Sequence, residues 1–503
     1  MTIEIELKLQ LPKAQNRRFK QWLKTNLPHA EGPALEHQVS IYYDTQALDL
    51  AHQGMGLRLR RQGNHWIQTL KLRQLAGAGL HQHQEFDTLV SGQTLELNHL
   101  DPGPASDFLC SPAIHGALKP LFQTDIKRNT WMVTREPDTR IEIALDSGYI
   151  ISGTRSQPIN EIELELIQGD LQAVYDLGEQ LAQHLRMALQ HRNKAEQGYL
   201  LYVGHVKQPV PTHPPEPLLS PLTESRQAMQ TIALANLQYL QDQLSGVLTM
   251  PELLEPVHQA HVALRRLRSL RKAFSKVVGH ERWNALLPDL QWLMEKIGQV
   301  RDLDVFLEEI LYPMEQIPAF KSPLAPIRQL VNEQRHQRFE ELDWAISSAR
   351  TTILLLRLLA WITLPLPQQT SPSLERLAHQ ALERTQKKVH RSIHDLSLLS
   401  AEQRHTLRKD LKTLRYSVEF FASLFKQHSV KRYLQPMQAL QTSLGSLNDS
   451  RSAKNLIDLL LQQQPELSSA TDLILGWIAH KESQANQQAE AATYLWIKTK
   501  PCW

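Results

Sequence analysis

The chain has 503 residues, of which 42% are hydrophobic and 21% are charged, and its net charge is +3 at pH 7. This length is sufficient for two or more hydrophobic cores, and the net charge says little until the positions of the charges are considered. The two cysteines, Cys110 and Cys502, exclude a disulfide framework and a cysteine-based metal site, which fits a reducing compartment.

No segment of the sequence is expected to enter a membrane. The N-terminal residues Met1 to Glu4 lack the basic and apolar regions of a secretory signal. The most apolar stretch, 353–366, is too short to cross a bilayer and contains Arg357. We therefore expect a cytoplasmic protein without a membrane partner.

Residues 1–202 are expected to form a β-rich domain. Segments in which polar and apolar residues alternate, separated by Gly and Pro, predict strands, and two amphipathic segments predict helices at 13–26 and 170–187. The predicted strands cover residues 3–10, 38–44, 55–62, 65–73, 82–89, 126–134, 140–146 and 159–167. Eight antiparallel strands can close into a barrel whose inward side chains alternate with outward ones.

Charged residues occupy every second position of the first predicted strand, at Glu4, Glu6 and Lys8, and aliphatic residues fill the gaps. The strand period of two places these charges on one face. Similar alternation returns at 58–60, 70–73 and 161–165. Four such strands in one region favour a closed sheet with a charged interior over four separate solvated edges.

The predicted interior contains charges of both signs. The cationic residues are Lys8, Arg58, Arg60, Lys71, Arg73, Arg128 and Lys194. The acidic residues are Glu4, Glu6, Glu85, Glu142, Asp146, Glu161, Glu163 and Glu165. Because buried charges without partners are costly, a polyanion with divalent cations would complete this set. Arg and Lys bind phosphate oxygens, and carboxylates hold Mg²⁺ or Mn²⁺. The alternative is a barrel whose walls are joined by salt bridges alone.

Several of these motifs resemble the CYTH superfamily of triphosphate tunnel metalloenzymes. They are Glu4-x-Glu6-x-Lys8, Gly56-Leu57-Arg58-Leu59-Arg60, Thr69-Leu70-Lys71, Glu142 with Asp146, Glu161-x-Glu163-x-Glu165 and Lys194. The resemblance covers residues 1–202 and implies an eight-stranded antiparallel barrel that forms a tunnel. Members of the superfamily include class IV adenylyl cyclases, thiamine triphosphatases and inorganic triphosphatases.

The resemblance also implies roles for individual residues. The residues implied to bind triphosphate are Lys8, Arg58, Arg60, Lys71, Arg128 and Lys194. The residues implied to bind Mg²⁺ or Mn²⁺ are Glu4, Glu6, Asp146, Glu163 and Glu165. Glu85 and Glu142 match charged family positions as further catalytic candidates, whereas Arg73 and Glu161 could instead lie at the tunnel mouth. The implied reaction is in-line attack on a terminal phosphoryl group, with cationic side chains and metal neutralising its oxygens.

A proline-rich linker is predicted at 203–221, and helical periodicity follows it. The helical part contains an internal repeat at an offset of 147 positions (405 − 258), which predicts two halves of like structure. Ile297–Asp302 aligns with Leu444–Asp449 at the same offset. The repeated motifs are His258-x-x-His261-x-x-x-Arg265-x-x-Arg268 and His405-x-x-Arg408-x-x-x-Lys412-x-x-Arg415.

Each copy of the repeat places a histidine and the cations after it on one stripe of a helix. One such stripe is usually a solvated face, but its recurrence favours a shared anion-binding surface. Arg265-Arg266-Leu267-Arg268 and Lys412-Thr413-Leu414-Arg415-Tyr416 resemble motifs of the CHAD family, although His261 stands where that family usually has Arg. The resemblance implies two pseudo-symmetric four-helix bundles lining a basic groove for inorganic polyphosphate. The implied binding residues are His258, His261, Arg265, Arg266, Arg268, His405, Arg408, Lys412 and Arg415.

The sequence therefore predicts an α+β protein with a CYTH tunnel domain at 1–202, a linker at 203–221 and a CHAD domain at 222–503. The predicted activity is metal-dependent hydrolysis of inorganic triphosphate to pyrophosphate and phosphate, with polyphosphate bound by the helical domain. Adenylyl cyclase activity, thiamine triphosphatase activity and a non-catalytic polyphosphate-binding role stay open as alternatives. Nucleic acid is a disfavoured partner because the stripes carry few aromatic residues for base stacking, and association with polyphosphate granules is a further option.

Overall fold

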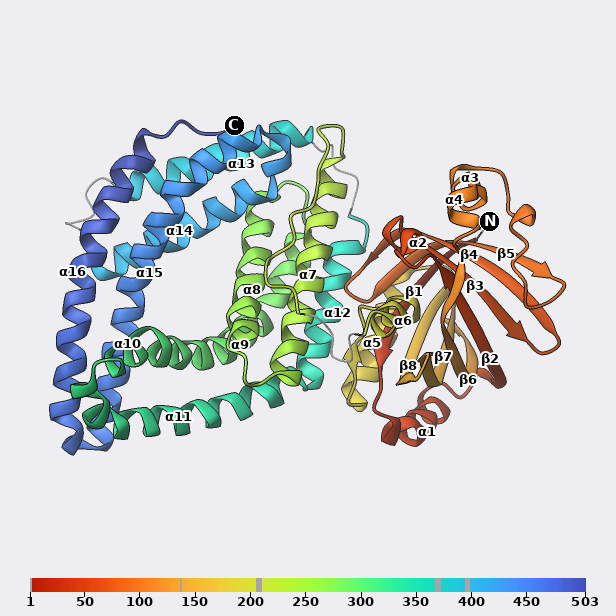
Figure 1. The fold of residues 1–503 in the computed structure, drawn as a ribbon, viewed down its shortest axis with the longest axis horizontal. Coiled ribbons are helices and arrows are strands. Elements are labelled where there is room, and N and C mark those ends of the chain that lie inside the picture. Colours follow the sequence, from red (N-terminus) through yellow and green to blue (C-terminus); the bar gives the residue numbers. More distant parts are fainter. Residues whose placement is uncertain (1, 136–137, 205–209, 367–371, 394–398) are drawn as a thin grey trace. The chain divides into compact units, whose positions relative to one another are not determined.

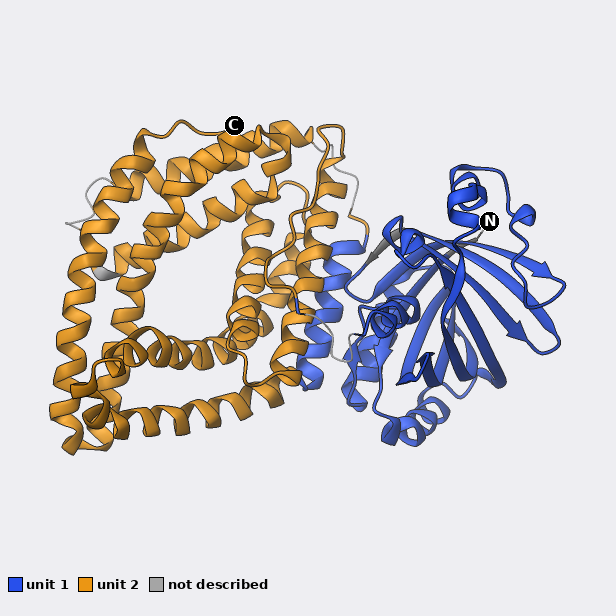
Figure 2. Ribbon diagram, in the orientation of Figure 1, with its two compact units in different colours: residues 1–210, 347–364 blue, residues 211–346, 365–503 orange. Residues whose placement is uncertain are grey.

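The computed structural model describes residues 2–135, 138–204, 210–366, 372–393 and 399–503. The chain forms two compact units (Figure 2). Unit 1 contains residues 1–210 and 347–364, and unit 2 contains residues 211–346 and 365–503. Unit 1 holds the strands, and unit 2 is helical in the part of the chain that is described. The predicted α+β class is confirmed.

Unit 1 is built on a closed antiparallel sheet (Figure 1). The strand order is β5-β4-β3-β2-β6-β7-β8-β1, and β1 also pairs with β5, which closes the barrel. A two-residue strand, β9 (Ala188–Leu189), pairs with the end of β1. Every predicted strand overlaps an observed one, so the predicted eight-stranded barrel is confirmed. The eight long strands are β1 (Thr2–Gln10), β2 (Glu31–Asp44), β3 (Met55–Gln62), β4 (His65–Gly77), β5 (Leu80–Val90), β6 (Lys119–Arg135), β7 (Thr139–Ser152) and β8 (Arg155–Gln168).

The outward face of the barrel is aliphatic because apolar and charged residues alternate along the strands. Leu7 and Leu9 on β1 are fully buried on this face. Helix α5 (Leu171–His184) packs over it so closely that a side chain at Gly178 would press against Leu7. The predicted helical cover is therefore present, and helix α1 (Asn16–Asn26) occupies the other predicted helical segment.

Helix α6 (Lys194–Tyr202) fills one end of the barrel with apolar side chains. Leu201 on α6 packs with Tyr42, Phe122 and Ile150, which come from three strands. A side chain at Gly198 would overlap the Phe122 ring, so the helix lies directly against the strands. Lys194, the first residue of α6, therefore lies where the charged interior meets this apolar end of the barrel.

Short helices cover other parts of the outer surface of the barrel. Leu50, Leu97 and Leu109 from these helices form an apolar cluster with Leu57 on β3 and Leu70 on β4. The short helices of unit 1 are η1 (Lys13–Gln15), α2 (Asp49–His52), η2 (Leu97–His99), α3 (Pro104–Cys110) and α4 (Pro112–His115).

Unit 2 reproduces the repeat of the sequence as two sets of four long helices. Helices α7, α8, α9 and α11 begin at residues 225, 255, 280 and 318, and adding 147 gives 372, 402, 427 and 465. Helices α13, α14, α15 and α16 begin at 374, 401, 427 and 468, within three residues of these values. The helices of unit 2 are α7 (Ser225–Thr249), α8 (Glu255–Ala273), α9 (His280–Val305), η3 (Phe306–Leu311), α10 (Tyr312–Glu315), α11 (Pro318–Ile346), α13 (Leu374–Ser392), α14 (Ala401–Phe420), η4 (Ala422–Leu424), α15 (Gln427–Gln463), η5 (Pro465–Leu467) and α16 (Ser468–Lys498).

Helix α12 (Ala349–Thr363) has no counterpart in this repeat and belongs to unit 1 (Figure 2). Its Leu356 lies against Gly178 of α5, and the hydroxyls of Tyr175 and Thr363 are 2.6 Å apart. The Thr352 hydroxyl also donates a hydrogen bond of 2.6 Å to the carbonyl oxygen of Met187. The predicted domain boundaries stay a prediction, but the structure adds that a helix from within the predicted 222–503 segment packs on the barrel.

The proline-rich segment forms neither helix nor strand from Val210 to Glu224. Residues 205–209 of the predicted linker lie outside the described residues. Two backbone groups of this segment are held by side chains of unit 2. Gln243 donates to the Pro211 carbonyl at 2.7 Å, and the Leu219 amide donates to the Ser423 hydroxyl at 2.9 Å.

Within the described ranges, no single helix has both the length and the apolar character needed to cross a membrane. Helices α11 and α12 satisfy these criteria together, but a bend of 54° separates them.

Candidate functional site

The charged residues of β1 point into the barrel. Glu6 and Lys8 are nearly inaccessible, yet their neighbour Leu7 is buried on the opposite face under α5. Two differently composed faces are thus buried on one strand. The strand period of two accounts for this arrangement, since Glu4, Glu6 and Lys8 share the inner face.

Strand register arranges the inner charges of β1, β8 and β7 in rows, because directly opposed residues of antiparallel strands share a face. In the first row, Glu165 lies between Glu6 and Glu142. In the second row, Glu163 lies opposite Lys8. The third row is Glu161, Asp146 and Arg128 across β8, β7 and β6.

The ammonium group of Lys194 lies among three carboxylates. Its Nζ atom is 2.7 Å from Asp146 Oδ2, 2.6 Å from Glu161 Oε1 and 2.7 Å from Glu163 Oε1. Burial acts to lower the pKa of Lys194, but these carboxylates raise it well above its ordinary value. An Asn193–Glu196 capping box fixes the start of α6 and so places Lys194. These three carboxylates lie within 4.8 Å of one another, close enough to hold one cation.

Glu163 is the most heavily neutralised acid of the interior. It accepts hydrogen bonds from Lys8, Lys194 and Arg128. Burial acts to raise its pKa, but Lys194, Lys8 and Arg128 hold it well below its ordinary value. Arg128 also grips Asp146 through two parallel bonds, Nε to Oδ1 at 2.8 Å and Nη2 to Oδ2 at 2.6 Å.

Cations prevail on the β3 and β4 side of the interior. Lys71 Nζ donates to Glu4 Oε2 at 2.8 Å and also pairs with Glu85. In the described part of the chain, no carboxylate forms an ion pair with Arg58 or Arg60, and the Nε atom of each is buried without a hydrogen-bond partner. Burial, followed by Arg58 and Arg128, lowers the pKa of Arg60 to about 10. An anion bound on this side of the barrel would supply the acceptors that Arg58 and Arg60 lack.

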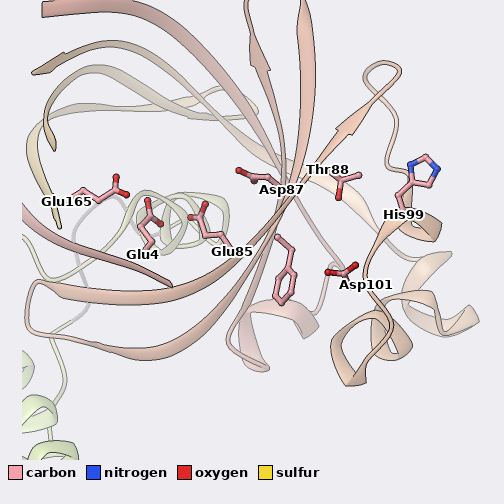
Figure 3. A pocket seen from close by; sticks show the side chains of 8 residues that line it. Glu4, Glu85, Asp87, Thr88, His99, Asp101 and Glu165 are labelled. Carbon is pink, nitrogen blue, oxygen red and sulfur yellow. The ribbon is translucent and has the colours of Figure 1, made fainter. Parts of the chain in front are cut away.

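Acids prevail where the interior opens into a cavity of about 390 Å³ (Figure 3). Figure 3 shows Glu165, Glu4 and Glu85 in a row, with Asp87 next to them and Asp101 on the segment that follows β5. Burial, followed by Glu4, Glu6 and Glu142, raises the pKa of Glu165 to about 8. The lining residues are Glu4, Glu85, Phe86, Asp87, Thr88, His99, Asp101 and Glu165.

The row of Glu6, Glu165 and Glu142 has the chemistry of a site for a divalent cation. Glu165 and Glu142 form no ion pair with a described residue, and like charges directly opposite one another destabilise a sheet. Carboxylate oxygens are the ligands that Mg²⁺ and Mn²⁺ prefer. A cation between these acids would remove the repulsion that raises the pKa of Glu165.

A second charged site is a groove within unit 2, with a volume of about 600 Å³. Arg265 from α8 and Lys412 from α14 face it together with Arg301 from α9. Burial, followed by Arg265, Arg408 and Arg301, lowers the pKa of Lys412 to about 6. The residues that line it with titratable or cationic side chains are His258, His261, Arg265, Arg301, Glu309, Arg408, Lys412, Arg415, Tyr416, Asp449 and Lys481.

Residues 2–199 match the CYTH domain family and residues 231–458 match the CHAD domain family. The chain is a CYTH domain followed by a CHAD domain. An inorganic triphosphatase from Haemophilus influenzae is 34% identical over 212 residues, which are 40% of this chain and 55% of that protein. The chain thus matches about half the length of that relative. The crystal structure of the CHAD domain from the plant Ricinus communis is 26% identical with a TM-score of 0.50, and the match covers 56% of this chain and 96% of that one.

The CYTH barrel brings the predicted triphosphate-binding residues to one interior. These are Lys8, Arg58, Arg60, Lys71, Arg128 and Lys194. The predicted metal ligands fall into two groups. Asp146 and Glu163 lie around Lys194, whereas Glu4, Glu6 and Glu165 lie toward the acidic cavity, where Glu85 and Glu142 also lie.

The structure also shows the positions of the two residues that could have been at the tunnel mouth, Glu161 and Arg73. Glu161 is buried beside Lys194 rather than at the mouth, whereas Arg73 is exposed and pairs with Glu196 at 2.5 Å. His81 and His83 were not singled out in the sequence although both face the interior. Alternation did not mark these two residues, because the positions that follow each of them, 82 and 84, are also polar.

The CHAD groove contains six of the nine predicted polyphosphate-binding residues: His258, His261, Arg265, Arg408, Lys412 and Arg415. The other three do not line it. Arg266 is 2% exposed and pairs with Glu419, Arg268 points to Met294 Sδ at 3.4 Å, and His405 Nδ1 is 2.9 Å from Asn448 Oδ1. The sequence did not single out Arg301 for binding, although its repeated motif was visible.

Proposed function

We propose that this protein is a metal-dependent inorganic triphosphatase that hydrolyses triphosphate to pyrophosphate and phosphate inside its CYTH barrel. The observation that carries the proposal is the pair of guanidinium groups at Arg58 and Arg60, which face the interior without carboxylate partners in the described chain. Guanidinium groups bind phosphate oxygens in pairs of parallel hydrogen bonds. The Haemophilus influenzae relative is an inorganic triphosphatase, which supports the same substrate.

The other cations of the barrel would exchange a carboxylate for phosphate when the substrate binds. Lys8 is 3% exposed and pairs with Glu6 at 2.8 Å as well as with Glu163. Arg128 and Lys194 are tied to Asp146 in the same way. These ion pairs offset part of the buried charge before binding and leave the cations in place around a trianionic or more highly charged guest.

The carboxylates proposed to hold Mg²⁺ or Mn²⁺ are Glu4, Glu6, Glu165 and Glu142 toward the cavity. Asp146, Glu161 and Glu163 form a second acidic group, which Lys194 neutralises. When bound, a divalent cation supplies positive charge against phosphate oxygens and lowers the pKa of water.

The barrel residues contribute binding, orientation and charge to the proposed reaction. The cations hold the chain of phosphates along the barrel axis, so that water reaches a terminal phosphorus in line with the departing pyrophosphate oxygen. Arg58, Arg60 and Lys71 then stabilise charge on the phosphoryl oxygens in the transition state. The apolar plug of Phe122 and Leu201 excludes bulk water from the other end.

The test is an assay of the full chain in the presence of Mg²⁺. Inorganic triphosphate, ATP and thiamine triphosphate are supplied one at a time as the substrate. We expect phosphate and pyrophosphate in equal amounts from triphosphate, and loss of the activity with a metal chelator. Cyclic AMP from ATP, or faster cleavage of thiamine triphosphate, would favour the other two activities considered. Binding of triphosphate without any turnover would support a sensor instead.

We also propose that the CHAD groove binds inorganic polyphosphate. Basic side chains at Arg265, Arg301, Arg408, Lys412 and Arg415 line one groove, where their repulsion lowers the pKa of Lys412, and Arg415 pairs with Glu419 at 3.2 Å. Arg301 has weak acidic contacts, at 3.5 Å to Asp302 and 4.0 Å to Asp449. A linear polyanion would satisfy all five cations at once, since its charges repeat along its length.

The test compares two doubly charge-reversed full-length variants. Arg265→Glu with Lys412→Glu changes the groove, and Lys431→Glu with Arg432→Glu makes the same net change on the exposed surface of α15. We expect the first pair to abolish binding of long-chain polyphosphate and the second to leave most of it. Binding by the wild type should fall steeply with salt. Equal losses in both variants would point to nonspecific charge attraction.

A further inference from the structure

The imidazole of His81 is buried inside the CYTH barrel without a hydrogen-bond partner among the described residues. His81 lies directly opposite Glu6 where β5 pairs with β1, so its side chain shares the inner face with Glu6. It is 1% exposed, and neither ring nitrogen forms a hydrogen bond with any residue that the structure describes. Buried polar groups in folded proteins nearly always have a hydrogen-bond partner. The missing partner of His81 therefore points to a guest in the tunnel.

The surroundings of His81 indicate what this guest offers. Burial, followed by Lys8 and His83, holds the pKa of His81 well below its ordinary value, so the ring is neutral. A neutral imidazole has one N–H donor and one acceptor nitrogen. Lys8, a proposed phosphate ligand, is among its nearest charged neighbours, and oxygens on a phosphate beside Lys8 would accept the N–H.

The plane of the ring is held by His83. The two imidazoles are stacked, with ring centroids 5.8 Å apart and an interplanar angle of 13°. His83 lies opposite Glu4 on the same inner face. A ring that is held in this way can direct its N–H without losing side-chain freedom on binding, which favours a specific contact.

We propose that His81 is a further substrate-binding residue of the CYTH barrel, whose ring N–H donates a hydrogen bond to a non-bridging oxygen of the triphosphate held by Lys8. The proposal rests on the proposed function of the barrel. It assigns the contact to phosphate rather than to the metal, because Mg²⁺ selects oxygen ligands and the carboxylates on the same face already supply them.

The first experiment measures tripolyphosphate binding in EDTA and the KM for tripolyphosphate with Mg²⁺, using the full chain. We expect His81→Phe, which keeps a planar ring but removes the donor, to raise Kd and KM about tenfold, the lower end of what one hydrogen bond to a charged group contributes. His81→Asn and His81→Gln place an amide N–H near the two nitrogen positions, and at least one of them should recover part of the affinity. His65→Phe, at the exposed start of β4, is the matched control.

A second measurement uses the wild-type protein and does not depend on any variant folding. In histidine ¹⁵N spectra, the His81 signal, assigned by its loss in His81→Phe, should show one protonated nitrogen and shift when tripolyphosphate is added without metal. If Mn²⁺ or Mg²⁺ alone shifts it and tripolyphosphate does not, the ring is a metal ligand and the proposal is wrong.

The outcomes for His81 and for the proposed function are separable. Unchanged Kd and KM in a folded His81→Phe protein would overturn the role of His81. If Lys8→Ala weakened binding in the same assay, the proposed function would stand. Equal loss in the Phe, Asn and Gln variants would assign the effect to ring shape and would also overturn it. If the wild type neither binds nor hydrolyses tripolyphosphate, both the role of His81 and the proposed function fail.

Discussion

Glu165 on β8 lies directly opposite Glu142 on β7, and neither carboxylate is paired with a basic side chain in the described structure. Glu6 lies opposite Glu165 on its other side, where β1 pairs with β8. Burial raises the pKa of both Glu142 and Glu165, and the neighbouring acids raise it further. Three acids in one row are therefore the part of the interior that most needs a cation.

The first prediction concerns metal affinity and pH. Glu165, with a pKa of about 8, is largely protonated at pH 7, and a divalent cation requires the carboxylate. Metal binding should therefore release close to one proton at pH 7, and the affinity should rise with pH until about pH 8 and then level off. Titration calorimetry of Mn²⁺ in buffers of different ionisation enthalpy measures the proton released.

Glu165→Gln is the control for this effect. It removes the titrating group, so the remaining metal affinity should change little between pH 7 and 8. A wild-type affinity that is constant over this interval would contradict the raised pKa of Glu165.

The second prediction concerns Lys8. Replacement by Ala removes a cation that contacts the proposed substrate, and loss of one such electrostatic group typically lowers kcat by about 10²–10³. The barrel should still form because Lys194 and Arg128 neutralise Glu163, but with a lower Tm, since Glu6 loses its ion pair with Lys8. Steady-state assays with triphosphate and far-ultraviolet circular dichroism measure the two properties. Lys24→Ala, on the exposed side of α1, is the control, and activity equal to that control would exclude Lys8 from the site.

The third prediction concerns Lys194, whose ammonium group is surrounded by Asp146, Glu161 and Glu163. Lys194→Met leaves these buried carboxylates with Lys8 and Arg128 as their cations. Breaking a buried ion pair from one side costs about 3–5 kcal/mol, so we expect a lower Tm without metal. Mn²⁺ should raise the Tm of this variant more than that of the wild type, because a cation can then enter the position of the ammonium group. Thermal unfolding with and without Mn²⁺ tests this, and equal Mn²⁺ effects would contradict it.

The fourth prediction concerns helix α12. Leu356 is fully buried and lies against Gly178 of α5. Leu356→Ala should destabilise unit 1 by about 2–5 kcal/mol through lost burial and a residual cavity. Hydrogen exchange should report reduced protection in α5 and β1, whereas the half-exposed Leu287→Ala variant should leave both segments unchanged. Reduced protection confined to unit 2 would show that α12 does not stabilise the barrel.

The fifth prediction concerns proton uptake by the CHAD groove. Lys412, with a pKa of about 6, is mostly neutral at pH 7.5. A bound polyanion favours the charged form and raises this pKa, so polyphosphate binding at pH 7.5 should take up close to one proton per groove. Calorimetry in two buffers measures the uptake. Lys412→Met should remove it while Arg265 and Arg408 keep part of the affinity, and uptake equal to that of the wild type would assign the proton to another group.

Lys412 also affects stability, and the sign follows from its lowered pKa. Between pH 6 and its ordinary value of 10.5, the unfolded chain binds a proton at Lys412 that the folded chain does not. This lysine therefore destabilises the fold most below about pH 6, and the destabilisation declines as the pH rises from 6 to 10.5. Lys412→Met should flatten the stability of unit 2 between pH 7 and 9.

The sequence predicted which face of each strand is charged, because side chains alternate with a period of two regardless of which strands become neighbours. Glu4, Glu6 and Lys8 were therefore recognised on β1. The repeat at 147 residues similarly predicted two helical halves of like structure in the CHAD domain. These features are local, or they depend only on spacing along the chain.

Tertiary structure decided which of these charges meet. Glu163 lies opposite Lys8 because of the register between β1 and β8, which are far apart in sequence, and no local pattern specifies that register. Glu165 lies opposite Glu142 across the β7–β8 hairpin, but only the pairing of β8 with β1 brings Glu6 beside them. The same dependence on distant neighbours placed His81 beside Lys8, removed Arg266 from the groove by pairing it with Glu419, and placed α12 on the barrel. Periodicity assigns a residue to a face, whereas only the packing of remote segments assigns it a partner.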